Sequence, residues 1–181
     1  RVVHLLVLAA VDGFLADERP DAHERLLDRL LASPHFGERW GRHWLDVVGY
    51  TDTVGFDIDA ALVIQSEGKW RYRDYVVRSF NQDKPYDRFI TEQLAGDELV
   101  DWRNAEKFTP QIRELLVATG FLRTAQDYTH EPESNIPLNH FAVLHDTIEI
   151  VGSSLLGLTL NCARCHAHKF DPVPQEDYYR L

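Results

Sequence analysis

Two cysteines occur in the 181 residues, and they stand three positions apart with a histidine directly after the second. The run is Cys162-Ala163-Arg164-Cys165-His166, a spacing typical of covalent haem c attachment. In that chemistry two thiols add across the two vinyl groups of one haem, and the adjoining histidine is the proximal ligand of the iron. A gap of another length would misplace one thioether. The spacing therefore predicts Cys162, Cys165 and His166 as the haem-binding residues.

Other chemistries also use a pair of cysteines. Two thiols at this spacing can form a redox dithiol, or two buried cysteines and a surface histidine can fall into this order by chance. A zinc site is a further alternative, because Cys162, Cys165 and His168 could complete a tetrahedral set with one distant histidine. An oxidising compartment would make an unprotected zinc thiolate pair the less favoured of these alternatives.

The sixth position of the iron decides what a haem domain could do. The chain contains no methionine, so it cannot supply the His/Met axial pair of ordinary cytochromes c. We expect His43 as the distal ligand, because two tryptophans flank it, and His145 as the second choice. His35, His140 and Lys169 are the remaining candidates, unless the position is open. A second imidazole suits electron transfer, whereas an open site binds small ligands and can host catalysis.

Arginines that alternate with aromatic residues could hold the haem propionates. Arg71 and Arg73 lie among tryptophan and tyrosine in the stretch from Trp70 to Asn81. A guanidinium can bind a carboxylate through two hydrogen bonds, although arginines are also common on the surface of any amphipathic helix. With a haem bound by His43, this helix would lie near the propionates, and we expect Arg71 or Arg73 as the contacts.

Apolar residues recur every three or four positions through most of the chain, which is typical of helices. The predicted helices are the leucine-rich segment before Ser33 and the ranges 36–50, 70–81, 85–96, 109–120 and 138–157, followed by a new helix after Pro174. Strand signals are weak, and the stretch 51–68 has the composition of a loop. The sequence therefore predicts a mainly α fold, a single multi-helix domain with long connecting loops.

The inward positions of these helical patterns predict the core. They are Leu26, Leu30, Trp40, Trp44, Phe80, Phe89, Leu115, Phe141, Ile148 and Leu155. Trp40 and Trp44 belong to an aromatic stripe that could be ordinary core or one wall of a haem pocket.

Composition limits the class of protein. Hydrophobic residues at 44% and charged residues at 27% are ordinary for a globular protein, and the net charge of −10 argues against nucleic acid as a partner. No run approaches the roughly 20 apolar residues that span a bilayer. A chain of this length needs no second domain, so we treat 1–181 as one unit. It has no initial methionine and stops inside a predicted helix, so we expect a fragment of a longer chain.

Four stretches of the chain resemble one family. They are RLLASPHFGERWGRHWLDV at 29–47, the range 69–99, ATGFLR at 118–123 and LLGLTLNCARCHAHKFDPVPQEDYYRL at 155–181. Together they are similar to the cytochrome-c-like domain of unknown function in large, predicted secreted proteins of planctomycetes and their relatives, whose motif is Cys-x-x-Cys-His-x-His-Lys-Phe-Asp-Pro. The chain departs from that family at Ala167, where members often carry Asp, and at Val48-Gly49-Tyr50, where Ala-Arg-Tyr is usual.

The resemblance implies a location, and the haem motif with its candidate axial ligands indicates a role. Secretion is predicted for the family and thioether attachment takes place outside the cytoplasm, so we expect a periplasmic or cell-surface protein. The expected function is a c-type haem-binding domain that serves electron transfer, with other domains of the same longer protein and a redox partner as its partners. A haem-dependent redox enzyme domain acting on an extracytoplasmic substrate, such as a carbohydrate, and a zinc or structural-metal interaction domain stay open as alternatives.

Overall fold

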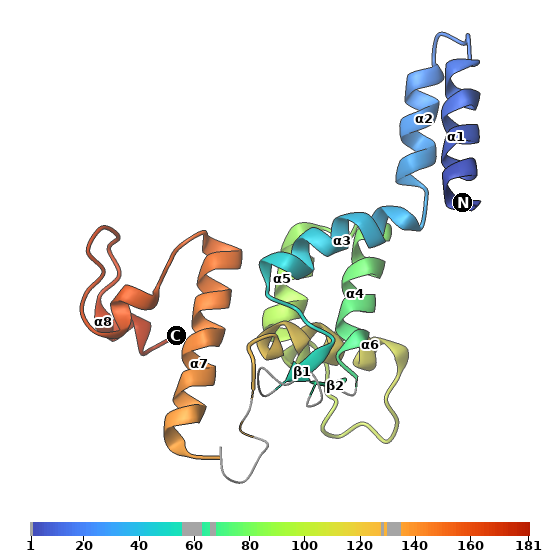
Figure 1. Ribbon diagram of the computed structural model, residues 1–181. Coiled ribbons are helices and arrows are strands. Elements are labelled where there is room, and N and C mark those ends of the chain that lie inside the picture. Colours follow the sequence, from blue (N-terminus) through green and yellow to red (C-terminus); the bar gives the residue numbers. More distant parts are fainter. Residues whose placement is uncertain (1, 56–62, 66–67, 128, 130–134) are drawn as a thin grey trace.

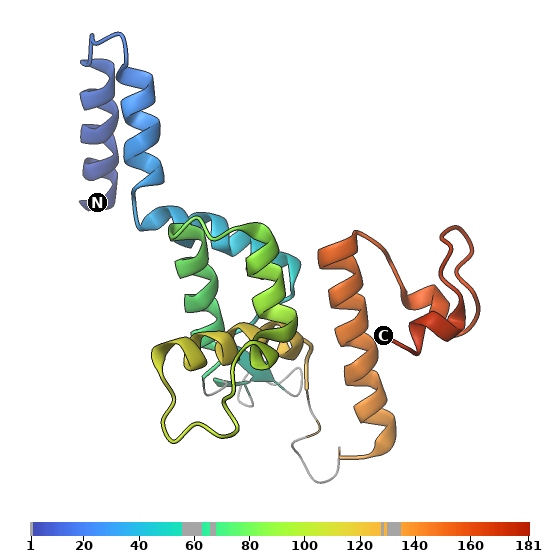
Figure 2. The ribbon, with the colours of Figure 1, turned by 180° about the vertical axis from the view of Figure 1, so that it is seen from behind.

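The fold is mainly α, as the spacing of apolar residues predicts. The computed structural model describes residues 2–55, 63–65, 68–127, 129 and 135–181. Along the chain, Figure 1 shows a helical hairpin, then a central body of short helices, and then a long helix that carries the C-terminal segment. Figure 2 shows the same three parts from behind.

The helical hairpin consists of α1 (Val2–Leu15) and α2 (Ala22–Leu31) and projects from the body. α2 has the predicted leucine stripe, but Leu30 is 54% exposed and Leu26 is only half-buried. The prediction that these leucines belong to the core is therefore wrong. Because α2 lies outside the body, no helix of the body covers its stripe.

The body contains four helices in the described part of the chain, and two 3₁₀ turns extend them. They are α3 (His35–Val47), α4 (Trp70–Asn81), α5 (Tyr86–Ala95), η2 (Gly96–Leu99), α6 (Pro110–Ala118) and η3 (Thr119–Arg123). These elements confirm the predicted helices. The start of α6 shows why, because the Thr109 side chain accepts a hydrogen bond from the Ile112 amide at 3.2 Å and Pro110 occupies the first turn.

The predicted loop at 51–68 contains a short antiparallel strand pair. β1 (Thr53–Gly55) pairs with β2 (Val63–Gln65), with Val54 opposite Ile64. β-branched residues in both segments favour extended backbone, but each strand has only three residues and is too short to show an alternating pattern. The rest of that predicted loop, apart from its two ends, lies outside the described residues.

Close contact between α3 and α4 depends on Gly37. A Cβ atom at this position would lie 2.3 Å from the carbonyl oxygen of Val77, so any side chain would force the two helices apart. Asn81 at the end of α4 secures the contact. Its Oδ1 accepts the Gly37 amide at 2.7 Å, and its Nδ2 donates to the Pro34 carbonyl at 2.9 Å. The side chain thereby satisfies a free backbone amide in the first turn of α3.

The main core lies where α3, α4, α5 and η3 meet. Its buried residues are Leu45, Val48, Tyr72, Tyr75, Val76, Phe89, Ala118 and Phe121. The core prediction is confirmed for the residues that are buried or pack against this cluster, namely Trp44, Phe80, Phe89, Leu115 and Leu155. It is wrong for Trp40 and Phe141, which are 50% and 58% exposed. Both stand on helical surfaces that no described element covers.

Two adjacent polar residues of α5 are buried inside the body. Glu92 is 2% exposed and receives Lys84 Nζ at 2.5 Å, Arg88 Nε at 2.7 Å and the Tyr75 hydroxyl at 3.0 Å. Gln93 is 1% exposed, and its Oε1 accepts hydrogen bonds from the Tyr72 hydroxyl and from Trp44 Nε1. These two side chains therefore join α5 to both α3 and α4.

The C-terminal part begins with α7 (Pro137–Val151), which continues into a π-helical turn, η5 (Gly152–Leu156). Ile150, Val151 and Leu155 pack against the main core, and this end of the helix thereby joins the body. A 3₁₀ turn, η6 (Asn161–Arg164), and the short α8 (Gln175–Tyr178) follow. Within the described ranges, no helix has both the length and the apolar character needed to cross a bilayer.

The buried carboxylate of Glu92 generates a stability prediction. Replacing it by Gln leaves Lys84, whose side chain is 9% exposed, without its counter-charge. Breaking a buried ion pair from one side costs about 3–5 kcal/mol. We therefore expect Glu92→Gln to lower the urea midpoint of unfolding strongly, whereas Glu38→Gln, at an exposed carboxylate that pairs with His35, should leave the midpoint within error.

The same residue predicts a dependence on pH. Burial alone would raise the pKa of Glu92, but hydrogen bonds from Lys84, Arg88 and Tyr75 outweigh it, so the pKa lies below its ordinary value. Its contribution is present above the pKa of the unfolded chain and is lost as the pH falls through the lower folded-state pKa. Acid unfolding of Glu92→Gln should therefore depend less on pH in this range, and an unchanged slope would contradict the assignment.

Candidate functional site

The turn that follows α7 delivers the cysteine motif. Gly157 has a left-handed φ of 66°, a conformation that glycine adopts without strain, and it ends the π-helical turn. The chain then folds back onto Gly152, where a Cβ atom would lie 2.6 Å from Cδ1 of Leu160. The missing side chain at Gly152 therefore lets Leu160 dock immediately before the motif.

A small second core fixes the backbone of the motif. Its buried residues are Leu160, Ala163 and Tyr178, at 5%, 0% and 2% exposure. Ala163 is one of the two residues that separate the cysteines in the sequence, and Ile148 of α7 and Val173 pack against the same cluster. The predicted core residue Ile148 is thus confirmed as a packing residue, although it belongs to this smaller core.

Both cysteines point out of this small core. Cys162 and Cys165 are exposed and free, and the Cys165 amide donates to the Cys162 carbonyl at 3.4 Å across the 3₁₀ turn η6. Side chains three positions apart in such a turn lie on the same side. The two thiols are therefore available together to one ligand, which fits the two thioether bonds of a single haem.

His166 follows on the exposed surface and has a defined hydrogen bond. Its Nδ1 lies 2.8 Å from the carbonyl oxygen of Ala167. A carbonyl can only accept, so Nδ1 carries the proton, and Nε2 of the neutral ring keeps a free lone pair. A backbone carbonyl on the second ring nitrogen is a common way to orient a metal-binding histidine. The departure from the family pattern at Ala167 removes an acid, but the backbone at this position orients the histidine.

His168 serves the fold of the following turn. Its side chain is 6% exposed, and its Nδ1 accepts the backbone amides of Asp171 at 2.9 Å and Phe170 at 3.3 Å. The Asp171 carboxylate also lies 3.1 Å from Nδ1, but the two amide donors require an unprotonated nitrogen there, so this contact is not an ion pair. The neutral ring then has its proton on Nε2.

This tautomer does not fit the predicted zinc set. Because Nδ1 accepts the two amides, the neutral ring carries its proton on Nε2. A zinc ion at Nε2 would have to displace that proton. In the part of the chain that the structure describes, no group of three or more histidine, cysteine, aspartate or glutamate side chains is arranged to hold a metal ion. The donors Cys162, Cys165 and His168 therefore do not form a ready tetrahedral site with a fourth ligand.

His145 of α7 packs against the segment that carries the motif. Its Nδ1 lies 2.8 Å from the hydroxyl of Tyr178, and the two rings stack with centroids 5.7 Å apart. Burial, together with the nearby guanidinium of Arg164, lowers the pKa of His145 below its ordinary value. The ring is therefore neutral at pH 7 and has the protonation state needed for binding a metal.

The structure does not bring His43 to the motif. His43 is exposed on α3, where its ring lies 5.4 Å from that of Trp40. Figure 1 shows α3 in the body and the motif segment on the opposite side of α7. Two other candidates, His35 and His140, are exposed and bonded to Glu38 and Asn135, each within its own segment.

The predicted propionate arginines also lie in the body. Arg73 of α4 pairs with Asp52 at 3.1 Å and with Asp74 at 3.2 Å, and Arg71 lies over the ring of Trp70. These contacts account for both side chains without a haem. Arg164, by contrast, lies between the two cysteines themselves.

Sequence reasoning missed the roles of Tyr178 and Arg164. The helix after Pro174 was predicted, but nothing in its spacing distinguishes the buried Tyr178 from Tyr179, which is 60% exposed. Arg164 occupies a variable position of the haem motif. Its carbonyl accepts hydrogen bonds from Gln175 at 3.0 Å and from Tyr179 at 2.9 Å, which tie α8 to the turn of the cysteines.

Large apolar side chains are exposed around the motif. Phe170 is 83% exposed, and Leu156, Tyr179 and Leu181 are between 60% and 67% exposed. A haem is a large, flat and mostly apolar body, so side chains of this kind could cover it. These features fit a haem c: two thiols on one turn, Nε2 of His166 as a possible iron ligand, and apolar side chains around them.

The His145–Tyr178 contact can be tested by Tyr178→Phe, which removes one hydroxyl. Loss of a hydrogen bond in a buried setting costs about 0.5–1.5 kcal/mol. The C-terminal part has a small core of its own, so this loss should favour its local opening. We expect faster amide hydrogen exchange at Ala163, whose amide bonds the Leu160 carbonyl. The control Tyr86→Phe, at a 64% exposed tyrosine of α5, should leave that exchange rate unchanged.

Comparison with known proteins places the chain in a family. No curated protein and no solved structure matches it. One family model, described as PSCyt2, a protein of unknown function (DUF1549), matches residues 7–181, which is nearly the whole chain. The match takes in the body, α7 and the cysteine motif, and we conclude that the chain belongs to the PSCyt2 family, whose function is unknown.

Proposed function

We propose that this domain binds one haem c through thioether bonds to Cys162 and Cys165, with His166 as the proximal ligand, and that it serves electron transfer within a larger secreted protein. The observation that carries the proposal is the hydrogen bond from His166 Nδ1 to the Ala167 carbonyl, next to two exposed thiols on one turn. A bound haem would supply an iron centre that takes up and releases one electron.

The chain's own residues would fix the position of that group. Ala163, in the turn that carries the two thiols, is fully buried in the small core shared with α7 and α8, so the backbone of the attachment points would be fixed before a haem binds. Arg164 lies beside them, and its guanidinium is a suitable partner for a propionate. The exposed Phe170 and Leu156 would reduce the access of water to the bound group.

For the far side of the iron, His145 has stronger support than His43. His145 contacts Tyr178 of the motif-bearing segment, and in the tautomer in which Nδ1 donates to the hydroxyl, Nε2 would be the nitrogen that binds a metal. His43 stays a prediction from the sequence that no contact supports. Two imidazoles would give an iron that changes oxidation state with little rearrangement, which is why we propose electron transfer ahead of catalysis.

A periplasmic or cell-surface location follows from the same proposal, because thioether attachment takes place outside the cytoplasm. Other domains of the longer protein, or a separate redox protein, would then exchange electrons with the haem.

The covalent link can be tested by protein matured in a host that attaches haem c. Acid-acetone extraction should leave the pigment on the unmodified chain, and replacing both Cys162 and Cys165 by serine should release all of it. Each single replacement should leave one thioether and shift the reduced absorption band to longer wavelength. His140→Ala, at an exposed histidine bonded to Asn135, is the control that should retain the pigment. Extractable pigment, or zinc in place of iron, in the unmodified protein would overturn the proposal.

The distal ligand can be tested by comparing two histidine variants of the pigmented protein. With His145 on the iron, His145→Ala should convert a low-spin spectrum into a high-spin one that binds carbon monoxide, while His43→Ala should leave the spectrum unchanged. The opposite pattern would return the assignment to His43. A high-spin spectrum in the unmodified protein would mean an open site, and the redox-enzyme alternative would then replace electron transfer.

A further inference from the structure

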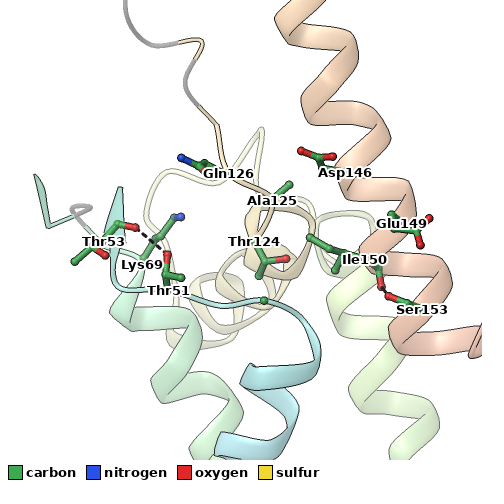
Figure 3. A pocket seen from close by; sticks show the side chains of 11 residues that line it. Thr51, Thr53, Lys69, Thr124, Ala125, Gln126, Asp146, Glu149, Ile150 and Ser153 are labelled. Atoms are coloured by element: carbon green, nitrogen blue, oxygen red, sulfur yellow. Dashed lines mark hydrogen bonds between the residues drawn. The ribbon is translucent and has the colours of Figure 1, made fainter. Parts of the chain in front are cut away.

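A cleft of about 520 Å³ lies between the body and α7, away from the cysteine motif. Figure 3 shows its two walls, with Lys69 and Thr53 on one side and Asp146 and Glu149 on the other. The lining described by the structure contains no aromatic side chain. A surface of this composition is suited to a polar, charged ligand.

The α7 wall presents two carboxylates one helical turn apart. Asp146, Glu149, Ile150 and Ser153 follow the spacing of a single helix face. The Ser153 hydroxyl is already used, because it donates to the Ile150 carbonyl at 3.3 Å. Among the described residues, the Oε2 atom of Glu149 is buried and has no hydrogen-bond partner. Leaving a carboxylate oxygen without a partner is costly, so this atom marks a place where a donor is missing.

The opposite wall presents one ammonium group. Lys69 is half-buried, and within the described residues no hydrogen bond or ion pair involves its side chain. Burial, followed by the charge of Arg123, lowers the pKa of Lys69 below its ordinary value. The nearby Asp127 acts in the opposite direction, but it already pairs with Arg123 at 3.0 Å. Lys69 is therefore a cation without a direct partner in the part of the chain that the structure describes.

The charges of the cleft define the chemistry of a ligand. A molecule that satisfies both walls needs a donor cation toward Asp146 and Glu149 and an anionic acceptor toward Lys69. Simple sugars carry neither charge, and no aromatic ring lines the cleft for a sugar to stack on. We propose that this cleft binds a compact zwitterion, an amino acid or short peptide, with its ammonium group at Asp146 and Glu149 and its carboxylate at Lys69.

The lining carries two acidic groups and one basic group in its described part, so a ligand with an additional positive charge is favoured. L-lysine is therefore the probe of choice, and its volume is well within that of the cleft. Lysine amide lacks the carboxylate. Lysine acetylated on both amino groups keeps the carboxylate but lacks both ammonium groups. These two analogues test each wall of the cleft separately.

The experiment is calorimetric titration of the chain, as it is expressed, with L-lysine. Each charge-assisted contact contributes about 1.5–3 kcal/mol, so Glu149→Gln and Lys69→Gln should each weaken binding by tenfold or more. Asp28→Asn, at an exposed carboxylate of α2 outside the cleft, is the matched control and should leave binding unchanged. Lysine amide should bind weakly to the unmodified chain, and its affinity should be insensitive to Lys69→Gln.

Loss of binding in Glu149→Gln can be distinguished from unfolding. Replacing a half-buried carboxylate that has one unpartnered oxygen among the described residues should leave the thermal midpoint unchanged or raise it. The proposal is overturned if L-lysine does not bind at millimolar concentration, if glucose binds equally well, or if neither variant changes the affinity. Because the cleft contains no residue of the haem motif, these outcomes are independent of the pigment test.

Discussion

The body depends on two polar side chains that α5 buries next to each other. Placing Glu92 in the interior costs several kcal/mol of desolvation, which only a charged and well-bonded environment can offset. Lys84, Arg88 and Tyr75 supply that environment, and each comes from a different point of α4, α5 or the turn between them. The geometry that satisfies the carboxylate is therefore also the geometry that sets α4 against α5.

Gln93 extends this constraint to α3. Its Oε1 accepts from the Tyr72 hydroxyl at 2.6 Å and from Trp44 Nε1 at 3.1 Å, and its Nε2 donates to the Phe89 carbonyl at 3.0 Å. A slip of any of these helices would leave a buried polar group without its partner. Hydrophobic packing alone would tolerate several registers, whereas this network admits one, and α7 then docks through Ile150 and Leu155 on a body of fixed shape.

The parts that could be predicted from the sequence follow local rules. The bounds of α4, the Thr109 cap and the helix leading to Cys162 depend on apolar spacing and on residues within one turn, so the sequence predicts them well. The exposure of Leu30 and Phe141 could not be predicted, because an apolar stripe indicates a buried face without showing whether another element covers it. The same limit applies to the site. The spacing of the cysteine motif indicates Cys162, Cys165 and His166. The contact of His145 with Tyr178 joins residues 33 positions apart, so no local pattern predicts it.

α7 links the two sites that we propose, because neighbouring residues on it face different partners. His145 contacts Tyr178 beside the motif, while Asp146 lines the cleft toward the body. The helix is anchored to the body at its C-terminal end by Ile150 and Val151, and the small motif core rests on the same helix through Ile148. Because successive residues of an α-helix point about 100° apart, His145 and Asp146 can serve different surfaces of the same helix, and the docking of α7 on the body positions both.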